Sequence, residues 1–233
     1  PMLVVAALLF GLIFFWLIWR ETLLEQRAVA RLQVLPGVRI DPVSFIRLKR
    51  EFEHKWLAPL NKLYPGSAPV FAVQLDRPLP PSARDDLAAI RHLRSFQASG
   101  RGFTDADLAA ITGCDTLTNL VLMDTSVTDG GLAVVTRFPR LRRIQLTGTP
   151  IRGPALATLS SLPLFEMSLG RTLIDDASLA YLTKMKSLDR LDLYATPITD
   201  AGGVTLARIR NLRVLSLDRT AIGNPTLIAL GKK

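Results

Sequence analysis

Residues that usually carry enzyme chemistry are scarce in this chain. It has one cysteine, Cys114, and two histidines, His54 and His92, in 233 residues. A single cysteine excludes an intrachain disulfide, and two distant histidines lack the spacing of a metal site. The sequence also lacks a phosphate-binding glycine loop, a G-x-S-x-G motif and an H-E-x-x-H motif. It therefore argues against an enzyme, and we expect no metal, cofactor or small-molecule substrate.

Charge is missing from the first nineteen residues, PMLVVAALLFGLIFFWLIW. As a helix this run would reach roughly 28 Å, close to the thickness of a bilayer's hydrocarbon core. A cleaved signal peptide fits less well, because no basic segment precedes the run and no small-x-small site follows it. The sequence predicts a transmembrane helix. The aromatic residues that we expect to anchor it are Phe10, Phe14, Phe15, Trp16 and Trp19.

A repeat of 23 or 24 residues occupies the C-terminal part of the chain. Its units begin at Leu93, Leu117, Leu141, Leu164, Leu188 and Leu212. Each unit follows L-x-x-L-x-L-x-x-T-x-I and then places apolar residues three apart, which indicates a short strand followed by a helix or 3₁₀ turn. No unit can bury its apolar face alone, so the units must stack into a parallel sheet with one continuous core. The predicted fold is an α/β solenoid, a right-handed β-α horseshoe.

The composition divides the chain into three regions. They are a transmembrane helix with a polar helical extension (1–35), a linker and N-terminal cap (36–92), and the repeat domain of about six units (93–233). Within the middle region we expect short strands at 38–40 and 70–75 and an amphipathic helix at 43–63 that includes His54.

Two polar positions recur in the units. Aspartates stand just before the helical turns, where we expect them to cap the free amides of those turns: Asp105, Asp129, Asp176 and Asp200. Threonines follow the strands, where they are expected to hydrogen-bond the turning backbone: Thr125, Thr149, Thr172, Thr196 and Thr220. Cys114 falls at an apolar position of its unit, which predicts a core residue and not a nucleophile.

The repeat resembles leucine-rich repeats, and in particular those of bacterial membrane-anchored proteins with the motif L-x-x-L-x-L-x-x-T-x-I-T-D-A-G-L. TPITDAG at 196–202 is almost identical to that motif. The resemblance extends upstream to the apolar N-terminal run and to the segments EQRAVARLQVLPGVRID and HKWLAPLNKLYP. It implies a non-enzymatic horseshoe that binds or scaffolds proteins.

Residues between the strand leucines are expected on the concave surface of such a horseshoe. In the later units they are charged or aromatic, and tyrosine and arginine are the commonest interface anchors. The predicted protein-binding surface consists of Arg143, Glu166, Arg190, Asp192, Tyr194, Asp218 and Arg219. A solvated sheet face with offsetting charges is the alternative.

The chain is basic, with a net charge of +9. The arginines that we assign to a basic rim are Arg137, Arg140, Arg142, Arg152, Arg210 and Arg213. Such a rim could contact anionic lipid headgroups or an acidic partner, or it could serve solubility alone. Nucleic acid is disfavoured because no aromatic residues alternate with the arginines.

Together these features predict a single-pass bacterial membrane protein whose repeats mediate protein–protein contacts, for example as an accessory subunit of a membrane complex. The alternatives are a structural spacer or an anionic-lipid-binding surface. The positive-inside rule places the repeats in the cytoplasm, because Arg20, Arg27 and Arg31 follow the span. Relatives in the resembling family often carry arginines before the span, which reverses that orientation. The side stays open, and we favour the extracytoplasmic one.

Overall fold

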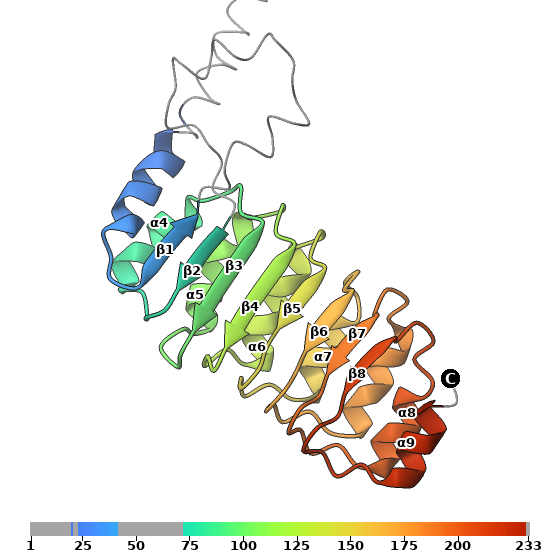
Figure 1. Cartoon of the computed structure of the whole chain (residues 1–233). Helices are drawn as coiled ribbons and strands as arrows, with labels where there is room; N and C mark the ends of the chain where they lie inside the picture. The colour runs from blue at the N-terminus through green and yellow to red at the C-terminus, as the bar shows by residue number, and fades with distance from the viewer. Residues whose placement is uncertain (1–19, 21–22, 42–71, 232–233) are drawn as a thin grey trace, which may run out of the picture.

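A computed structural model of the chain describes residue 20 and residues 23–41 and 72–231 (Figure 1). The predicted span at 1–19 with its aromatic anchors, and the amphipathic helix expected at 43–63 with His54, lie outside these residues. Within the described ranges, no helix is both long and apolar enough to cross a bilayer.

A single eight-stranded sheet runs through the described residues in sequential order. β1 pairs antiparallel with β2, and every later pair is parallel. The strands are β1 (Val38–Asp41), β2 (Ala72–Leu75), β3 (Ser95–Ser99), β4 (Asn119–Met123), β5 (Arg143–Gln145), β6 (Glu166–Ser168), β7 (Arg190–Asp192) and β8 (Val214–Ser216). The predicted parallel α/β solenoid is thereby confirmed for the repeats.

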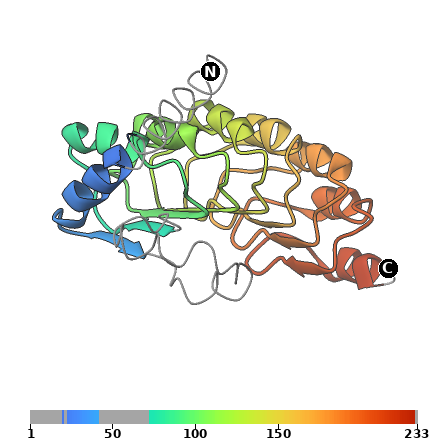
Figure 2. The same ribbon diagram turned by 90° about the horizontal axis from the view of Figure 1, so that it is seen from above.

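A helical segment follows each parallel strand and returns the chain to the start of the next one. Figure 2 shows these segments along the outer side of an arc, with the sheet on its inner side. They are η1 (Pro81–Ala83) with α4 (Arg84–Ala88), α5 (Asp105–Ala110) with η2 (Ile111–Gly113), α6 (Asp129–Leu132) with η3 (Ala133–Arg137), α7 (Gly153–Leu159), η4 (Ala177–Lys184), α8 (Asp200–Leu206) and α9 (Asn224–Gly231).

The repeating leucines form the core, as the pattern predicts. Equivalent positions pair directly across the sheet, for example Leu120 with Ile144 and Leu191 with Leu215. The apolar positions of the second unit, from Leu117 to Phe138, are completely buried. Cys114 is buried as expected, and its thiol donates to the Ile90 carbonyl at 2.9 Å. Burial raises the pKa of this thiol to about 12, so it is not a reactive nucleophile.

Each of the strands β3 to β8 ends in a sharp turn that contains one left-handed residue. The residues with positive φ at this position are Gly100, Asp124, Gly148, Arg171, Ala195 and Arg219. The recurring threonine follows, and its hydroxyl donates to the carbonyl three residues earlier in four of the five units: Thr149, Thr172, Thr196 and Thr220. The expected role of these threonines in the turn is confirmed for these four. The Thr125 hydroxyl is buried without a hydrogen-bond partner.

The N-terminal end of the sheet is covered by the segment that precedes the repeats. A helix at 23–33 buries Ala28 and Leu32 against the first turns of the solenoid. β1 then lies along β2, whose Val73 and Leu75 face the core. The parallel sheet begins at β2, so residues 72–75 form the first strand of the stack and β1 closes its edge.

Candidate protein-binding surface

The outward residues of the strands form rows across the inner side of the sheet. The first row runs through Ser95, Asn119, Arg143, Glu166, Arg190 and Val214, as the strand register requires. The next row runs through Gln97, Val121, Gln145, Ser168, Asp192 and Ser216. The structure therefore brings the predicted concave residues of the later units together on β5 to β8.

Charged side chains in the first row are paired with acidic neighbours. Arg143 Nε lies 3.4 Å from a Glu166 carboxylate oxygen on the adjacent strand. Arg190 Nε lies 3.8 Å from Asp189, which Arg213 also approaches at 3.4 Å. Except for Asp189, each of these side chains is at least 43% exposed, so the pairs contribute little to stability and remain available to a partner.

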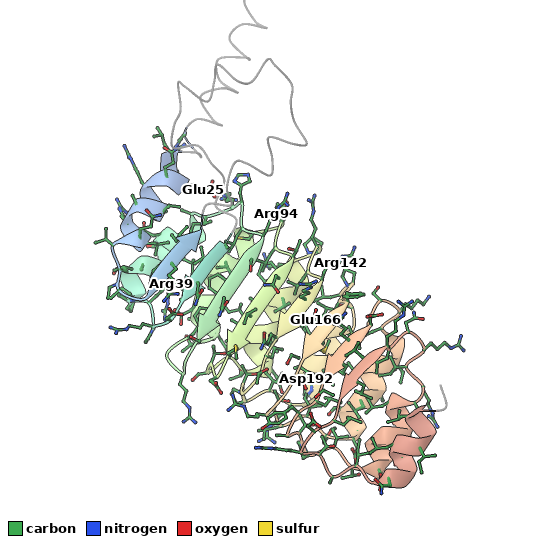
Figure 3. All side chains as sticks on the ribbon, viewed as in Figure 1. Glu25, Arg39, Arg94, Arg142, Glu166 and Asp192 are labelled. Atoms are coloured by element: carbon green, nitrogen blue, oxygen red, sulfur yellow. The ribbon has the colours of Figure 1, made fainter. Side chains whose placement is uncertain are left out.

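Asp192 is held in place by its neighbours. One carboxylate oxygen accepts from the Ser168 hydroxyl at 2.9 Å, and the other accepts from the Tyr194 amide at 3.0 Å. Both oxygens are thus engaged within the surface. Asp192 therefore shapes the turn that carries Tyr194, and its negative charge adds to the surface, where Figure 3 labels it.

Tyr194 and Arg219 form the aromatic centre of the surface. The Arg219 guanidinium carbon lies 5.4 Å from the centre of the Tyr194 ring, within cation–π distance. Arg219 is one of the left-handed turn residues, and the turn after β8 places its side chain beside Tyr194 of the preceding unit. Asp218 beside it is exposed. A half-buried tyrosine beside an exposed arginine, flanked by charges, suits protein recognition.

The arginines predicted for one rim do not all lie on the same edge. Arg140 and Arg142 precede β5, and Arg210 and Arg213 precede β8, so these four lie at the edge where strands begin. The Arg142 guanidinium donates to the Pro163 carbonyl at 3.1 Å along that edge. Arg137 ends η3 on the helical side. Arg152 precedes α7, so it lies at the opposite edge, where strands end.

The expectation that the recurring aspartates cap their own helices is wrong. Asp105 instead accepts from the amide and hydroxyl of Thr128 in the next unit, at 2.8 and 2.7 Å. Asp176 binds Thr199 in the same way, at 2.8 and 2.5 Å. Asp129 accepts from the amide of Arg152, and Asp200 from that of Gly223. The carboxylates therefore join successive units, because the first helical position faces the next turn of the stack.

This ladder is interrupted once, where Gly153 replaces the aspartate. The following unit compensates within itself, because the Ser178 amide and hydroxyl both donate to Asp175. These bonds lower the pKa of Asp175. Of the adjacent carboxylates Asp175 and Asp176, only Asp175 accepts from its own helical turn, and the cap predicted at Asp176 is not formed.

A pair of residues that the sequence analysis missed lies on the edge where strands end. Arg171 donates to both carboxylate oxygens of Asp124 at 2.8 and 3.0 Å, two units away along the chain. The intervening Gly148 leaves the space that this pair needs. The sequence could have indicated this pair, because the same repeat position holds Asp124, Gly148 and Arg171 in three successive units. The two opposite charges are separated only by a glycine, which has no side chain.

Metal-binding geometry is not found in the described ranges, where no three histidine, cysteine or acidic side chains converge. His92 Nδ1 lies 3.1 Å from a Glu25 carboxylate oxygen, a contact that joins His92 to the helix at 23–33.

Comparison with solved structures finds repeat proteins at low identity. The structure is similar to a crystal structure of an internalin from Listeria monocytogenes, with 18% identity, a TM-score of 0.41, and coverage of 68% of this chain and 57% of that one. It is similar also to a pollen receptor kinase 3 structure, with 18% identity, a TM-score of 0.42, and coverage of 68% and 77%. No protein-family model and no curated protein matches the chain.

The class of protein follows from the chain's own strand order and repeat register. Sequential parallel strands at 23- or 24-residue intervals, with a buried Leu-x-Leu or its equivalent from β3 to β7 and a partly buried one at β8, define a leucine-rich-repeat solenoid. The chain spans 57% of the length of the internalin that it resembles.

Proposed function

We propose that this chain displays its repeats beside a bacterial membrane as a protein-binding surface, without enzymatic activity. The observation that carries the proposal is the pairing of half-buried Tyr194 with exposed Arg219 on the inner side of the arc. A tyrosine ring that already packs against a guanidinium group on a preformed surface loses little conformational entropy on binding. The strands beneath them are fixed by continuous pairing from β6 to β8.

Membrane attachment is the second part of the proposal. It is supported by the uncharged run at 1–19 and by Trp16 and Trp19 at its end. A tethered solenoid would hold its inner surface close to membrane proteins, as an accessory subunit of a complex does. We propose that the repeats lie on the extracytoplasmic side. Extraction of native membranes at alkaline pH tests the tether, because a spanning helix keeps the chain in the pellet. Protease access in intact cells tests the side.

Partner capture tests the binding surface. The full chain is extracted from native membranes in mild detergent, and co-purifying proteins are quantified for Tyr194→Ala and for the control Tyr181→Ala. Tyr181 is exposed in η4 on the outer side of the arc. Loss of an interface anchor typically costs about 2 kcal/mol, roughly 30-fold in affinity. We expect Tyr194→Ala to lose a partner that Tyr181→Ala retains.

A structural spacer is the competing function. It predicts that both variants co-purify with the same proteins in the same ratio, since a spacer acts through its length and not through one side chain. Equal recovery of every partner by Tyr194→Ala, Arg219→Ala and the wild type would remove the binding proposal and favour the spacer.

A further inference from the structure

The two edges of the solenoid carry opposite charge. The edge where strands begin, called the basic edge here, carries exposed cations at Arg91, Arg94, Arg140, Arg142, Lys186, Arg210 and Arg213. In the segments that lead into β3 to β8, the carboxylates on this edge are Asp115 and Asp189. The opposite edge holds Asp76, Asp105, Asp107, Asp124, Asp129, Asp175, Asp176, Asp200 and Asp218 against the smaller set Arg77, Arg84, Arg101, Arg152, Arg171 and Arg219. The sequence alone shows the net charge, whereas the fold places most cations at one edge and most carboxylates at the other.

The N-terminal part of the chain enters the domain at the basic edge. Glu25, near the start of the helix at 23–33, accepts from the backbone amides of Arg91 and His92 at 3.1 and 3.2 Å. Farther along the helix, Arg31 pairs with Asp86 on α4 at 3.2 Å. The helix therefore begins beside Arg91 and runs away from the basic edge. Figure 3 shows Glu25, Arg94 and Arg142 on the same side of the molecule, while Arg39 lies farther down.

Strand direction gives the same result. β1 runs antiparallel to β2 and ends with Asp41 opposite Ala72, the first residue of β2. Its end therefore lies at the edge where the parallel strands begin. The helix at 23–33 and β1 thus form a hairpin-like excursion that starts and finishes at the basic edge.

We propose that the basic edge faces the membrane and contacts anionic phospholipid headgroups, so that the solenoid stands on this edge. Its strands then lie along the membrane normal, and its inner surface opens sideways toward a neighbouring membrane protein. The orientation rests on the proposed tether, because the uncharged run directly precedes the helix that begins at this edge. The lipid contact rests separately on the charge of the edge itself.

Electrostatics favours this arrangement over the reverse. Each lysine or arginine near an anionic leaflet raises binding roughly fivefold, and the effect decays within about 10 Å. Many carboxylates of the opposite edge are engaged in the ladder between units, but they keep their negative charge and are repelled from such a surface. Tyr194 follows the end of β7 and Arg190 begins it, so the partner surface extends away from the headgroups.

A pair of fluorescent labels in one repeat tests the orientation. The full chain is reconstituted in nanodiscs of phosphatidylcholine alone or with about one third phosphatidylglycerol, with a quencher on the lipid headgroups. Ser187→Cys places a label on the basic edge, and Ala201→Cys places one on the opposite edge. Both positions are exposed, and buried Cys114 does not compete for the label.

The double variant Arg140→Gln with Arg210→Gln removes two cations of the basic edge. The control, Arg101→Gln with Arg152→Gln, removes two cations from the opposite edge and so changes the net charge equally.

We expect stronger quenching at Ser187→Cys than at Ala201→Cys, a larger difference with phosphatidylglycerol, and a smaller one at high salt. The basic-edge double variant should reduce the ratio of docked to undocked domain about 25-fold, while the control double variant leaves it unchanged. Equal quenching at both labels in anionic nanodiscs would overturn the proposal. An acidic protein or nucleic acid as the true occupant would give this result.

Failure of the tether gives a different result from failure of the lipid contact. Without a tether the chain leaves the membrane at alkaline pH, yet the lipid contact still predicts flotation with anionic vesicles and not with neutral ones. Flotation that is equal for the two double variants would then overturn the role of the basic edge.

Discussion

Arg171 Nη2 donates to both carboxylate oxygens of Asp124 across the turn that contains Gly148. All three residues occupy the same left-handed position in successive units, with φ of 54°, 73° and 55° in chain order. The two charged side chains therefore lean toward each other over a residue that has none. This ion pair joins the first and third of three successive repeats at the edge where strands end, and it spans the repeat between them.

Gly148→Ala should destabilise the domain more than Gly100→Ala. A Cβ at Gly148 would lie 2.1 Å from an Asp124 carboxylate oxygen, whereas one at Gly100 meets nothing within 4 Å. Both glycines have positive φ, so both substitutions carry a backbone cost of about 1–2 kcal/mol. The ion pair adds up to about 1 kcal/mol for Gly148→Ala alone, because Asp124 must leave Arg171. Urea unfolding of both variants measures the difference, and equal losses would contradict the crowding.

Asp176→Ala should lower the free energy of unfolding by about 1–2 kcal/mol. Two hydrogen bonds that join its unit to Thr199 are lost, leaving the Thr199 amide without its carboxylate acceptor. Asp115→Ala is the control, since Asp115 is exposed and lies at the edge where the ladder does not run. Denaturant titration compares the two. A loss for Asp115→Ala as large as that for Asp176→Ala would show that general charge, and not the ladder, sets the stability.

Thr125→Val and Thr149→Val should have opposite effects on stability. The Thr125 hydroxyl is buried without a partner, so removing it relieves a desolvation cost and should stabilise by about 1 kcal/mol. The Thr149 hydroxyl donates to Leu146 at 2.6 Å, so its removal should destabilise by about 1 kcal/mol. Thermal unfolding of the two variants checks the signs. A fall in Tm for both would mean that the Thr125 hydroxyl is satisfied in solution.

Stability should fall below about pH 4, and Asp107 should contribute to the fall. Burial alone would raise the pKa of Asp107, but hydrogen bonds from Arg84 and Thr104 outweigh it and lower the pKa. A depressed native pKa stabilises the fold above the unfolded value of about 3.9, and this contribution is lost as pH falls through the native pKa.

Bonds from Thr226 and Gly223 lower the pKa of Asp200 in the same sense, which adds to the acid sensitivity. Asp107→Asn should be less stable than the wild type at pH 7, and the difference should shrink at pH 3. Urea midpoints at the two pH values measure it. A difference that does not depend on pH would show that the Asp107 charge is not involved.

The periodicity of the leucines was sufficient to predict the stack, because burial of an aliphatic side chain depends mainly on its repeat position. Leu120 and Leu191 lie in the core for the same reason, whatever their neighbours are. The aspartates show where this reasoning ends. Their position at the start of helical turns was predictable, but their partners were not, since capping their own helix and bridging to the next unit require the same sequence.

What the sequence by itself determined was the repeat, and with it the core, the parallel order of the strands and the rows of the inner surface. These follow from spacing along one chain. The tertiary structure alone decided that Arg171 reaches Asp124, that Arg219 lies over Tyr194, and that cations and carboxylates separate onto two edges. Such relations join residues about 25 to 50 positions apart, and they depend on the left-handed turns and on the pitch of the stack, which place side chains by geometry that no local pattern records.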